Sequence, residues 1–135
     1  MLAEAVNFAA TALISPRRVA GEIHDSVRLW ARSKRCGRDW AQHEAHCHDV
    51  VLSALDGLKH RRIAVVLGSG LLRDVPIEIL SKTFRDVWLV DLQHLVSVRA
   101  WAAFKALRNL RFMNRDLSGV SEPQPLAFLA EEAEI

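Results

Sequence analysis

The 135-residue chain contains no tyrosine, four prolines, six glycines and only two cysteines. The two cysteines, Cys36 and Cys47, cannot build the framework of several disulfides that stabilises many small secreted domains. No apolar run approaches the roughly 20 residues that a membrane-spanning helix requires, so the sequence predicts no membrane partner. The formal net charge of +2 is too small to indicate a nucleic-acid or membrane partner by itself.

The opening segment, MLAEAVNFAATALI, has the apolar character of a secretion signal but not its organisation. It has no basic leading region, it carries Glu4, and its apolar part is interrupted by Asn7 and Thr11. We therefore expect a cytoplasmic protein.

The composition is that of a globular chain, with 50% hydrophobic and 25% charged residues, and the length fits one domain. The apolar pattern changes near residue 60. Before that point, helical spacing within residues 23–31 and again within 47–58 predicts two long helices, the first of them signalled by Ser15-Pro16. We divide the chain into an N-terminal helical segment (1–60), a half-domain (61–119), and a linker with a short C-terminal helix (120–135).

The half-domain contains three short apolar runs that predict strands, at Ile63–Leu67, Val87–Val90 and Leu110–Met113. The first run is expected to be buried on both faces of a sheet, and the second is also expected to be a buried strand. A helix is predicted from about Val75, capped by Asp74 with Pro76 in its first turn, and another over Leu95–Ala106. Alternating strands and helices with short connections predict an α/β fold, in which the N-terminal helices precede a Rossmann-like parallel sheet of about three strands.

Gly68-Ser69-Gly70 follows the first predicted strand and precedes a helix. Such a turn directs backbone N–H groups outward and lets a ligand approach the main chain, although a glycine pair there often serves chain geometry alone. Asp91 ends the second predicted strand, 21 residues after Gly70. An acidic residue at this place can accept hydrogen bonds from both ribose hydroxyls of a nucleotide; the alternative is a solvated helix cap.

Three segments, AVVLGSG, VWLVDL and LRFMNRDLSG, together resemble the first half of a class I S-adenosylmethionine-dependent methyltransferase domain, over about residues 61–119. The resemblance implies S-adenosylmethionine as cofactor. It implies Gly68, Ser69 and Gly70 beneath the methionine part, Asp91 on the ribose and Asp116 near the adenine. It also implies methyl transfer to an acceptor that the sequence does not identify, with no residue assigned as catalytic base.

The chain departs from this family at three points. Leu72 stands where the family usually has a third glycine, Val66 stands where an acidic residue is common, and the sheet has fewer strands than the family's. Three explanations follow: an incomplete domain, a sheet completed by a homodimer through an open edge, or lost catalysis. The alternative function is a non-catalytic module that binds a partner or dimerises through a degenerate nucleotide-binding fold. An NAD-linked oxidoreductase fits less well, because Arg73 occupies the third glycine position of the dinucleotide fingerprint.

The segment HEAHCH suggests a metal site at first sight. On a helix, however, His43 and Cys47 share one face while His46 and His48 point elsewhere, so no metal is predicted. We expect Cys47 to face the core and the histidines to face solvent. His94, just past Asp91 at the start of a helix, is also expected on the surface; the alternative is that it reaches the ligand pocket.

Seven of the 18 basic residues lie within the 22 positions from Arg17 to Arg38, close to Trp30 and Trp40. Arginines interleaved with aromatic residues are typical of RNA-binding surfaces. The favoured interpretation is a helix that buries its tryptophans and keeps its arginines in water, so a nucleic-acid partner is an alternative only.

Overall fold

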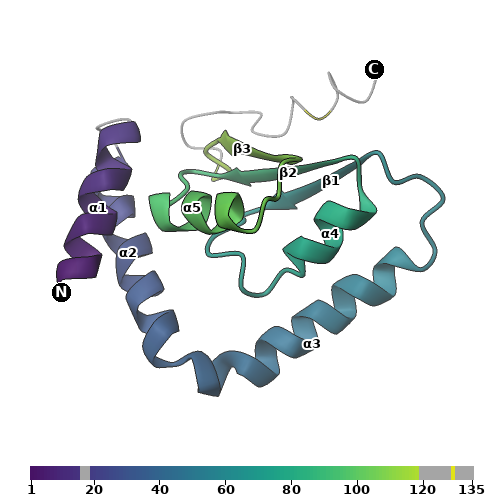
Figure 1. The fold of residues 1–135 in the computed structure, drawn as a ribbon, viewed down its shortest axis with the longest axis horizontal. Helices are drawn as coiled ribbons and strands as arrows, with labels where there is room; N and C mark the ends of the chain where they lie inside the picture. The colour runs from purple at the N-terminus through teal and green to yellow at the C-terminus, as the bar shows by residue number, and fades with distance from the viewer. Residues whose placement is uncertain (16–18, 119–128, 130–135) are drawn as a thin grey trace.

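The computed structural model of the protein describes residues 1–15, 19–118 and 129. It confirms the α/β class: three N-terminal helices precede a three-stranded parallel sheet (Figure 1). The elements are α1 (Leu2–Ile14), α2 (Ala20–Arg35), α3 (Gly37–Leu55), β1 (Ile63–Leu67), α4 (Ile77–Thr83), β2 (Asp86–Asp91), α5 (Val96–Phe104) and β3 (Leu110–Asn114). Apart from Leu129, the predicted C-terminal helix lies outside the described residues.

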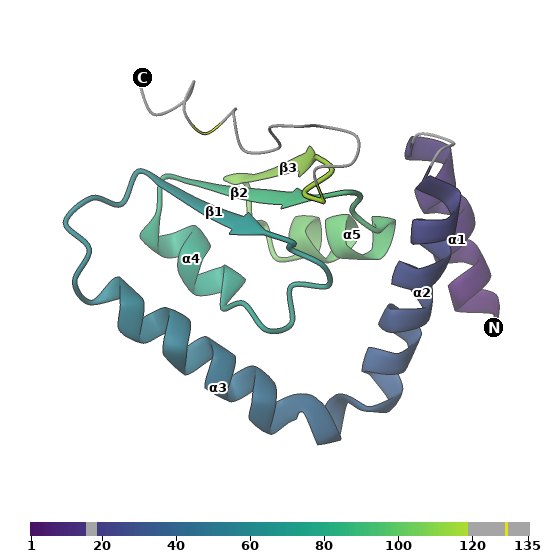
Figure 2. The ribbon, with the colours of Figure 1, turned by 180° about the vertical axis from the view of Figure 1, so that it is seen from behind.

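The strand order is β1-β2-β3, so β2 is the central strand and β1 and β3 are the edges of the described sheet. Both crossover helices, α4 and α5, lie on the same face of the sheet (Figures 1 and 2). The burial expected of β1 is wrong: no β1 residue is fully buried and Leu67 is 47% exposed, because β1 is an edge strand. The buried strand expected at Val87–Val90 is confirmed in β2, where Val87, Leu89 and Val90 are 0% exposed, because a central strand is covered on both sides.

The main core lies between the sheet and the helices. Ile23 and Val27 of α2 are 1% and 4% exposed and belong to the same buried cluster as Leu89 and Val98, which confirms the apolar stripe predicted on that helix. A second cluster on the other face of the sheet is centred on Trp88 and Val90, with the side chain of Leu129 packed against it.

Helix α3 differs from its prediction. No α3 residue is fully buried, Val50 is 57% exposed and Cys47 is half-buried, so the expected core stripe is wrong. Only one edge of the helix, through Val51 and Leu55, packs against the core. Figure 1 shows why: α3 lies outside α4 and does not reach the sheet.

Helix α4 begins at Ile77 without a side-chain cap, and its N-cap residue is Pro76. The predicted capping role of Asp74 is therefore wrong. Among the described ranges, no helix combines the length and the apolarity that crossing a membrane requires.

Two polar side chains of helix α1 are buried in the protein, while its two leucines are exposed. Asn7 and Thr11 are 6% and 0% exposed, whereas Leu2 and Leu13 are 81% and 87% exposed. The reason is the first turn of α5, whose own N-cap residue supplies no capping side chain. Thr11 Oγ1 accepts a hydrogen bond from the amide of Val96 at 3.0 Å, and Asn7 Oδ1 accepts one from the amide of Ser97 at 3.3 Å. Two polar side chains of α1 thus satisfy backbone N–H groups that a helix start leaves without partners.

We expect Thr11→Val to lower the free energy of unfolding by about 1–2 kcal/mol, because it leaves the Val96 amide without its acceptor while keeping the side-chain shape. Urea unfolding followed by circular dichroism measures the change. Thr83→Val is the matched control, since Thr83 is only partly buried and makes no such bond in the described part of the chain. Equal losses in the two variants would contradict the capping role.

Candidate functional site

The loop after β1, which we call the glycine loop (Gly68–Asp74), folds back over the end of β2. The amides of Gly68 and Ser69 both donate to the carbonyl oxygen of Val90, at 2.8 and 3.3 Å. Gly68 and Gly70 have φ of 67° and 49°, a conformation that residues with a Cβ rarely adopt. Leu72 also has a positive φ, 59°. Leu72 stands where the family that the sequence resembles usually has a third glycine, and its side chain is buried, 6% exposed, although its backbone is strained.

The carboxylate of Asp91 lies against the glycine loop. Its Oδ2 accepts a hydrogen bond from the Gly70 amide at 2.7 Å, and its Oδ1 accepts one from the Leu92 amide at the same distance. The structure therefore brings together the two groups that the sequence singled out, in direct contact. A carboxylate offers about four lone-pair positions, so each oxygen of Asp91 retains one beyond these two bonds.

Ser69 and His94 form a buried pair beneath the loop. Both residues are 2% exposed, and Ser69 Oγ lies 3.4 Å from His94 Nδ1. On the other side of the ring, His94 Nε2 lies 3.2 Å from the carbonyl oxygen of Met113. A carbonyl only accepts, so Nε2 carries the proton and Nδ1 accepts from the serine hydroxyl. The side chain of Ser69 thus points into the protein, although its residue lines the hollow described below.

The surface position expected for His94 is wrong. The ring packs edge-on against Phe112, with centroids 5.0 Å apart. Burial lowers the pKa of His94, because the charged imidazolium loses hydration, and the nearby Arg99 lowers it further. The sequence did hold a signal for this residue: it follows the end of a buried strand by three positions, at the edge where parallel strands end together.

Asp116 lies on the same edge of the sheet, two residues after β3. Its Oδ1 accepts hydrogen bonds from the amide and the hydroxyl of Ser118, at 2.9 and 2.5 Å. The preceding residue, Arg115, donates its amide to the carbonyl oxygen of Asp91 at 2.8 Å, which keeps this turn beside β2. All five residues predicted for the cofactor thus lie at the carboxyl edge of the sheet.

A hollow of about 440 Å³ separates the glycine loop from α2 and α3. Its size lies within the range of roughly 300–1,000 Å³ that is usual for small-molecule sites. One wall is the glycine loop and the other comes from Leu29, Trp40, His43 and Glu44. The sequence predicted the first wall and missed the second, because nothing in the pattern of the helices shows which residues face a loop some thirty positions later. Neither Asp91 nor Asp116 is in its lining; Asp91 adjoins the hollow through its bond to Gly70, whereas Asp116 follows the opposite edge strand, β3.

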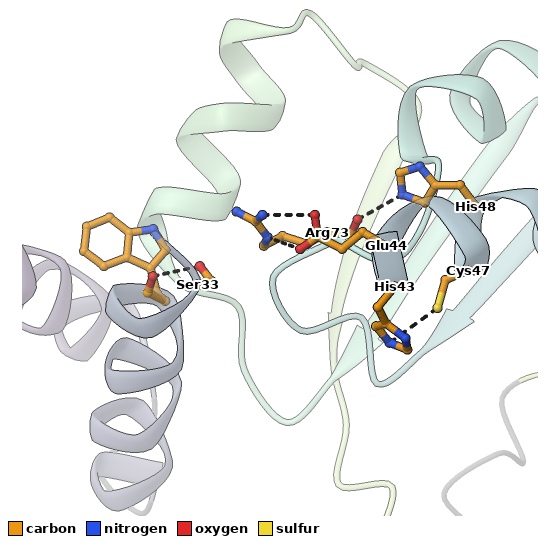
Figure 3. A network of polar contacts seen from close by, with 7 residues as sticks. Ser33, His43, Glu44, Cys47, His48 and Arg73 are labelled. Atoms are coloured by element: carbon orange, nitrogen blue, oxygen red, sulfur yellow. Dashed lines mark hydrogen bonds and ion pairs between the residues drawn. The ribbon is translucent and has the colours of Figure 1, made fainter. Parts of the chain in front are cut away.

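Arg73 and Glu44 join the two walls. The guanidinium forms a two-point contact with the carboxylate, Nε to Oε1 at 2.5 Å and Nη2 to Oε2 at 3.0 Å (Figure 3). The hydrogen bond that Arg73 donates to Glu44 raises the pKa of Arg73 above its already high value. His48 Nε2 also lies 2.9 Å from the carbonyl oxygen of Arg73. Helix α3, which buries no residue fully, is therefore attached to the glycine loop by polar contacts.

Two further motifs of the N-terminal segment, HEAHCH and the basic run with its tryptophans, make contacts within the described residues. Cys47 Sγ lies 3.5 Å from His43 Nε2, and the described residues contain no group of three or more metal-ligating side chains. Lys34 Nζ lies 4.1 Å from the ring centroid of Trp30, and the Arg32 guanidinium lies 5.9 Å from that of Trp40. A base stacking on the covered face of either ring would have to displace that cation.

Protonation of His94 is expected to destabilise the fold. Because its pKa in the folded state is lowered, the unfolded chain binds the proton more readily, so stability is complete above the ordinary histidine pKa and falls as the pH drops below it. The free energy of unfolding, measured by urea titration from pH 7.5 to 5, should decline more steeply for the wild type than for His94→Gln. His24→Gln, which changes a 64% exposed side chain, is the control and should keep the wild-type slope. A slope unchanged in His94→Gln would contradict this assignment.

No model of a protein family, no curated protein and no solved structure matches the chain, so its function has to be argued from the geometry of this edge of the sheet.

Proposed function

We propose that the protein binds S-adenosylmethionine, or its product S-adenosylhomocysteine, at the carboxyl edge of the sheet. The observation that carries the proposal is the contact between the Gly70 amide and the Asp91 carboxylate beside the hollow of about 440 Å³. Ligands of open α/β sheets bind outside the carboxyl ends of the strands, where loops from neighbouring strands meet. Here the meeting point has a glycine-lined wall on one strand and a carboxylate with free lone pairs on the next.

The charge of the hollow supports this cofactor over a phosphate-bearing one. Its lining contains one arginine, Arg73, against two carboxylates, Glu44 and Asp74. A nucleoside di- or triphosphate would bring its negative charges against these carboxylates, whereas a sulfonium cation is attracted to them. The balance thus disfavours NAD and ATP and favours a ligand with a positive centre.

The proposed arrangement assigns each group a task. The methionine part lies in the hollow against Leu29, Trp40 and the glycine loop, and the ribose hydroxyls donate to the remaining lone pairs of Asp91. Asp116, at the next strand end, lies on the adenine side. The cofactor supplies an activated methyl group, and this chain's contribution is to bind it and to fix its orientation toward an acceptor.

We expect the wild-type protein to bind S-adenosylhomocysteine in isothermal titration calorimetry. Asp91→Asn should weaken binding about tenfold to a hundredfold, because hydrogen bonds to a charged partner contribute about 1.5–3 kcal/mol each. Asp86→Asn is the matched control: it changes an aspartate of the same strand at the opposite end, where the carboxylate pairs with Arg111. Circular dichroism verifies that both variants are folded. No binding by the wild type at millimolar ligand would overturn the proposal.

The second candidate is a module that pairs with another copy of itself, and helix α1 is the observation that favours it. Leu2, Val6, Ala9 and Leu13 follow one another at steps of four, three and four, the spacing of a coiled-coil seam. Val6 is 60% exposed, and the only charged residue of α1, Glu4, lies off this seam. In an antiparallel pair, Leu2 faces Leu13 and Val6 faces Ala9, so the seam complements itself. It offers nothing to a charged partner, and α1 itself carries no lysine or arginine, unlike the helices with a basic polar face that bind anionic membranes.

For this candidate we expect a monomer–dimer equilibrium in sedimentation experiments over a series of protein concentrations. Leu13→Lys should shift it to monomer, because burying the ammonium in an apolar seam is costly. Phe104→Lys is the control, since Phe104 is equally exposed, at 87%, but lies on α5. A wild-type protein that remains monomeric at the highest attainable concentration would exclude pairing through α1.

A further inference from the structure

The side chain of Arg73 is only partly used by the contacts that hold it. A guanidinium carries five N–H donors, and Glu44 accepts from Nε and Nη2. Nη1 has no acceptor within the part of the chain that the structure describes, and Figure 3 shows this nitrogen directed away from Glu44. The side chain is 35% exposed and lines the hollow. Arg73 therefore presents a held but unsatisfied donor edge to a ligand-sized space.

The carboxylate of Glu44 likewise has hydrogen-bonding capacity that Arg73 does not use. Each of its oxygens accepts one N–H from Arg73 and retains a further lone pair. Its side chain is 17% exposed and also lines the hollow, as does Asp74. A guanidinium with unused N–H donors thus lies directly beside a carboxylate with unused lone pairs.

We propose that Arg73 and Glu44 form a subsite for the charged end of an α-amino acid, an inference that rests on the proposed cofactor function. The ligand's carboxylate accepts from the free Nη1 edge of Arg73, and its ammonium group donates to the free lone pairs of Glu44. The two ligand charges are joined through one carbon atom, and the two protein side chains are in contact, so one ligand end of this kind can meet both opposite charges. In S-adenosylmethionine this end is the methionine head.

The two-point contact with Glu44 also prepares Arg73 for this task. A bidentate pair fixes the plane of the guanidinium, so less side-chain freedom remains to be lost when the ligand binds. The carbonyl oxygen of Arg73, held by His48, restrains the backbone at the same place. Glu44 therefore both accepts from the ammonium group and positions the arginine.

The competing explanation is a purely structural latch that attaches α3 to the glycine loop. A latch requires neither a donor that faces a ligand nor a hollow. Its loss would weaken the binding of every ligand of the site by the same factor. A subsite for the amino-acid end has a different signature: it affects only ligands that carry that end.

The experiment compares two ligands that share the adenosine part, S-adenosylhomocysteine and 5′-methylthioadenosine, which lacks the amino-acid end. Calorimetry should show the wild type binding the first at least about tenfold more tightly. Arg73→Gln should remove most of this preference by weakening the binding of S-adenosylhomocysteine about tenfold or more. Its affinity for 5′-methylthioadenosine should stay within about twofold of the wild-type value. Glu44→Gln should also reduce the preference. Arg73→Lys, which keeps the charge but loses the planar fork, should be intermediate.

Arg85→Gln is the matched control, because Arg85 is 79% exposed and lies at the opposite end of β2. Equal wild-type affinity for the two ligands would overturn the subsite and leave cofactor binding standing. An equal loss for both ligands in Arg73→Gln would identify the pair as a latch and would also overturn the subsite. No binding of either ligand by the wild type would overturn the proposed function and the subsite together. The wild-type comparison needs no variant, so it decides the question even if a substitution impairs folding.

Discussion

The hydrogen bond between the Asp91 carboxylate and the Gly70 amide, 2.7 Å long, organises the carboxyl edge of the sheet. It joins the loop after β1 to the end of β2, and the loop's strained backbone is held there together with the bonds that Gly68 and Ser69 make to Val90. A second polar layer lies beneath it, where His94 bridges Ser69 and the end of β3. All three strand ends are thereby connected through polar groups at one edge, which is what a preorganised binding edge requires.

The N-terminal helices contact this edge largely through long-range polar contacts. Asn7 of α1 bonds to Ser97, Ser26 of α2 accepts from Gln93, and Glu44 of α3 pairs with Arg73. The three contacts join residues that are 90, 67 and 29 positions apart. Helix α2 also contributes a buried apolar stripe to the core, whereas α3 contributes no fully buried residue. Segments with few buried apolar contacts open locally at low free-energy cost, so α3 is the wall of the hollow best able to adjust to a ligand.

The character of the hollow follows from which side chains these contacts leave unsatisfied. Arg73 retains donors, Glu44 and Asp91 retain acceptors, and the carboxylates outnumber the arginine in the lining. The proposed ligand, with its hydroxyls, zwitterionic end and positive centre, would match these groups, whereas the carboxylates would repel a phosphate. The chain also departs from the dinucleotide fingerprint, with Arg73 in place of its third glycine.

The sequence by itself determined the three strands and their parallel direction, because runs of apolar residues and glycine turns are local signals. It also placed Gly70 and Asp91 near each other, because parallel strands end at the same edge of the sheet. Tertiary structure decided the rest. It turned α1 polar side inward to cap α5, left α3 half-exposed, made β1 an edge strand, buried His94 and paired Arg73 with Glu44. Each of these depends on a partner far along the chain, and helical or strand periodicity shows which residues share a face but not what that face meets.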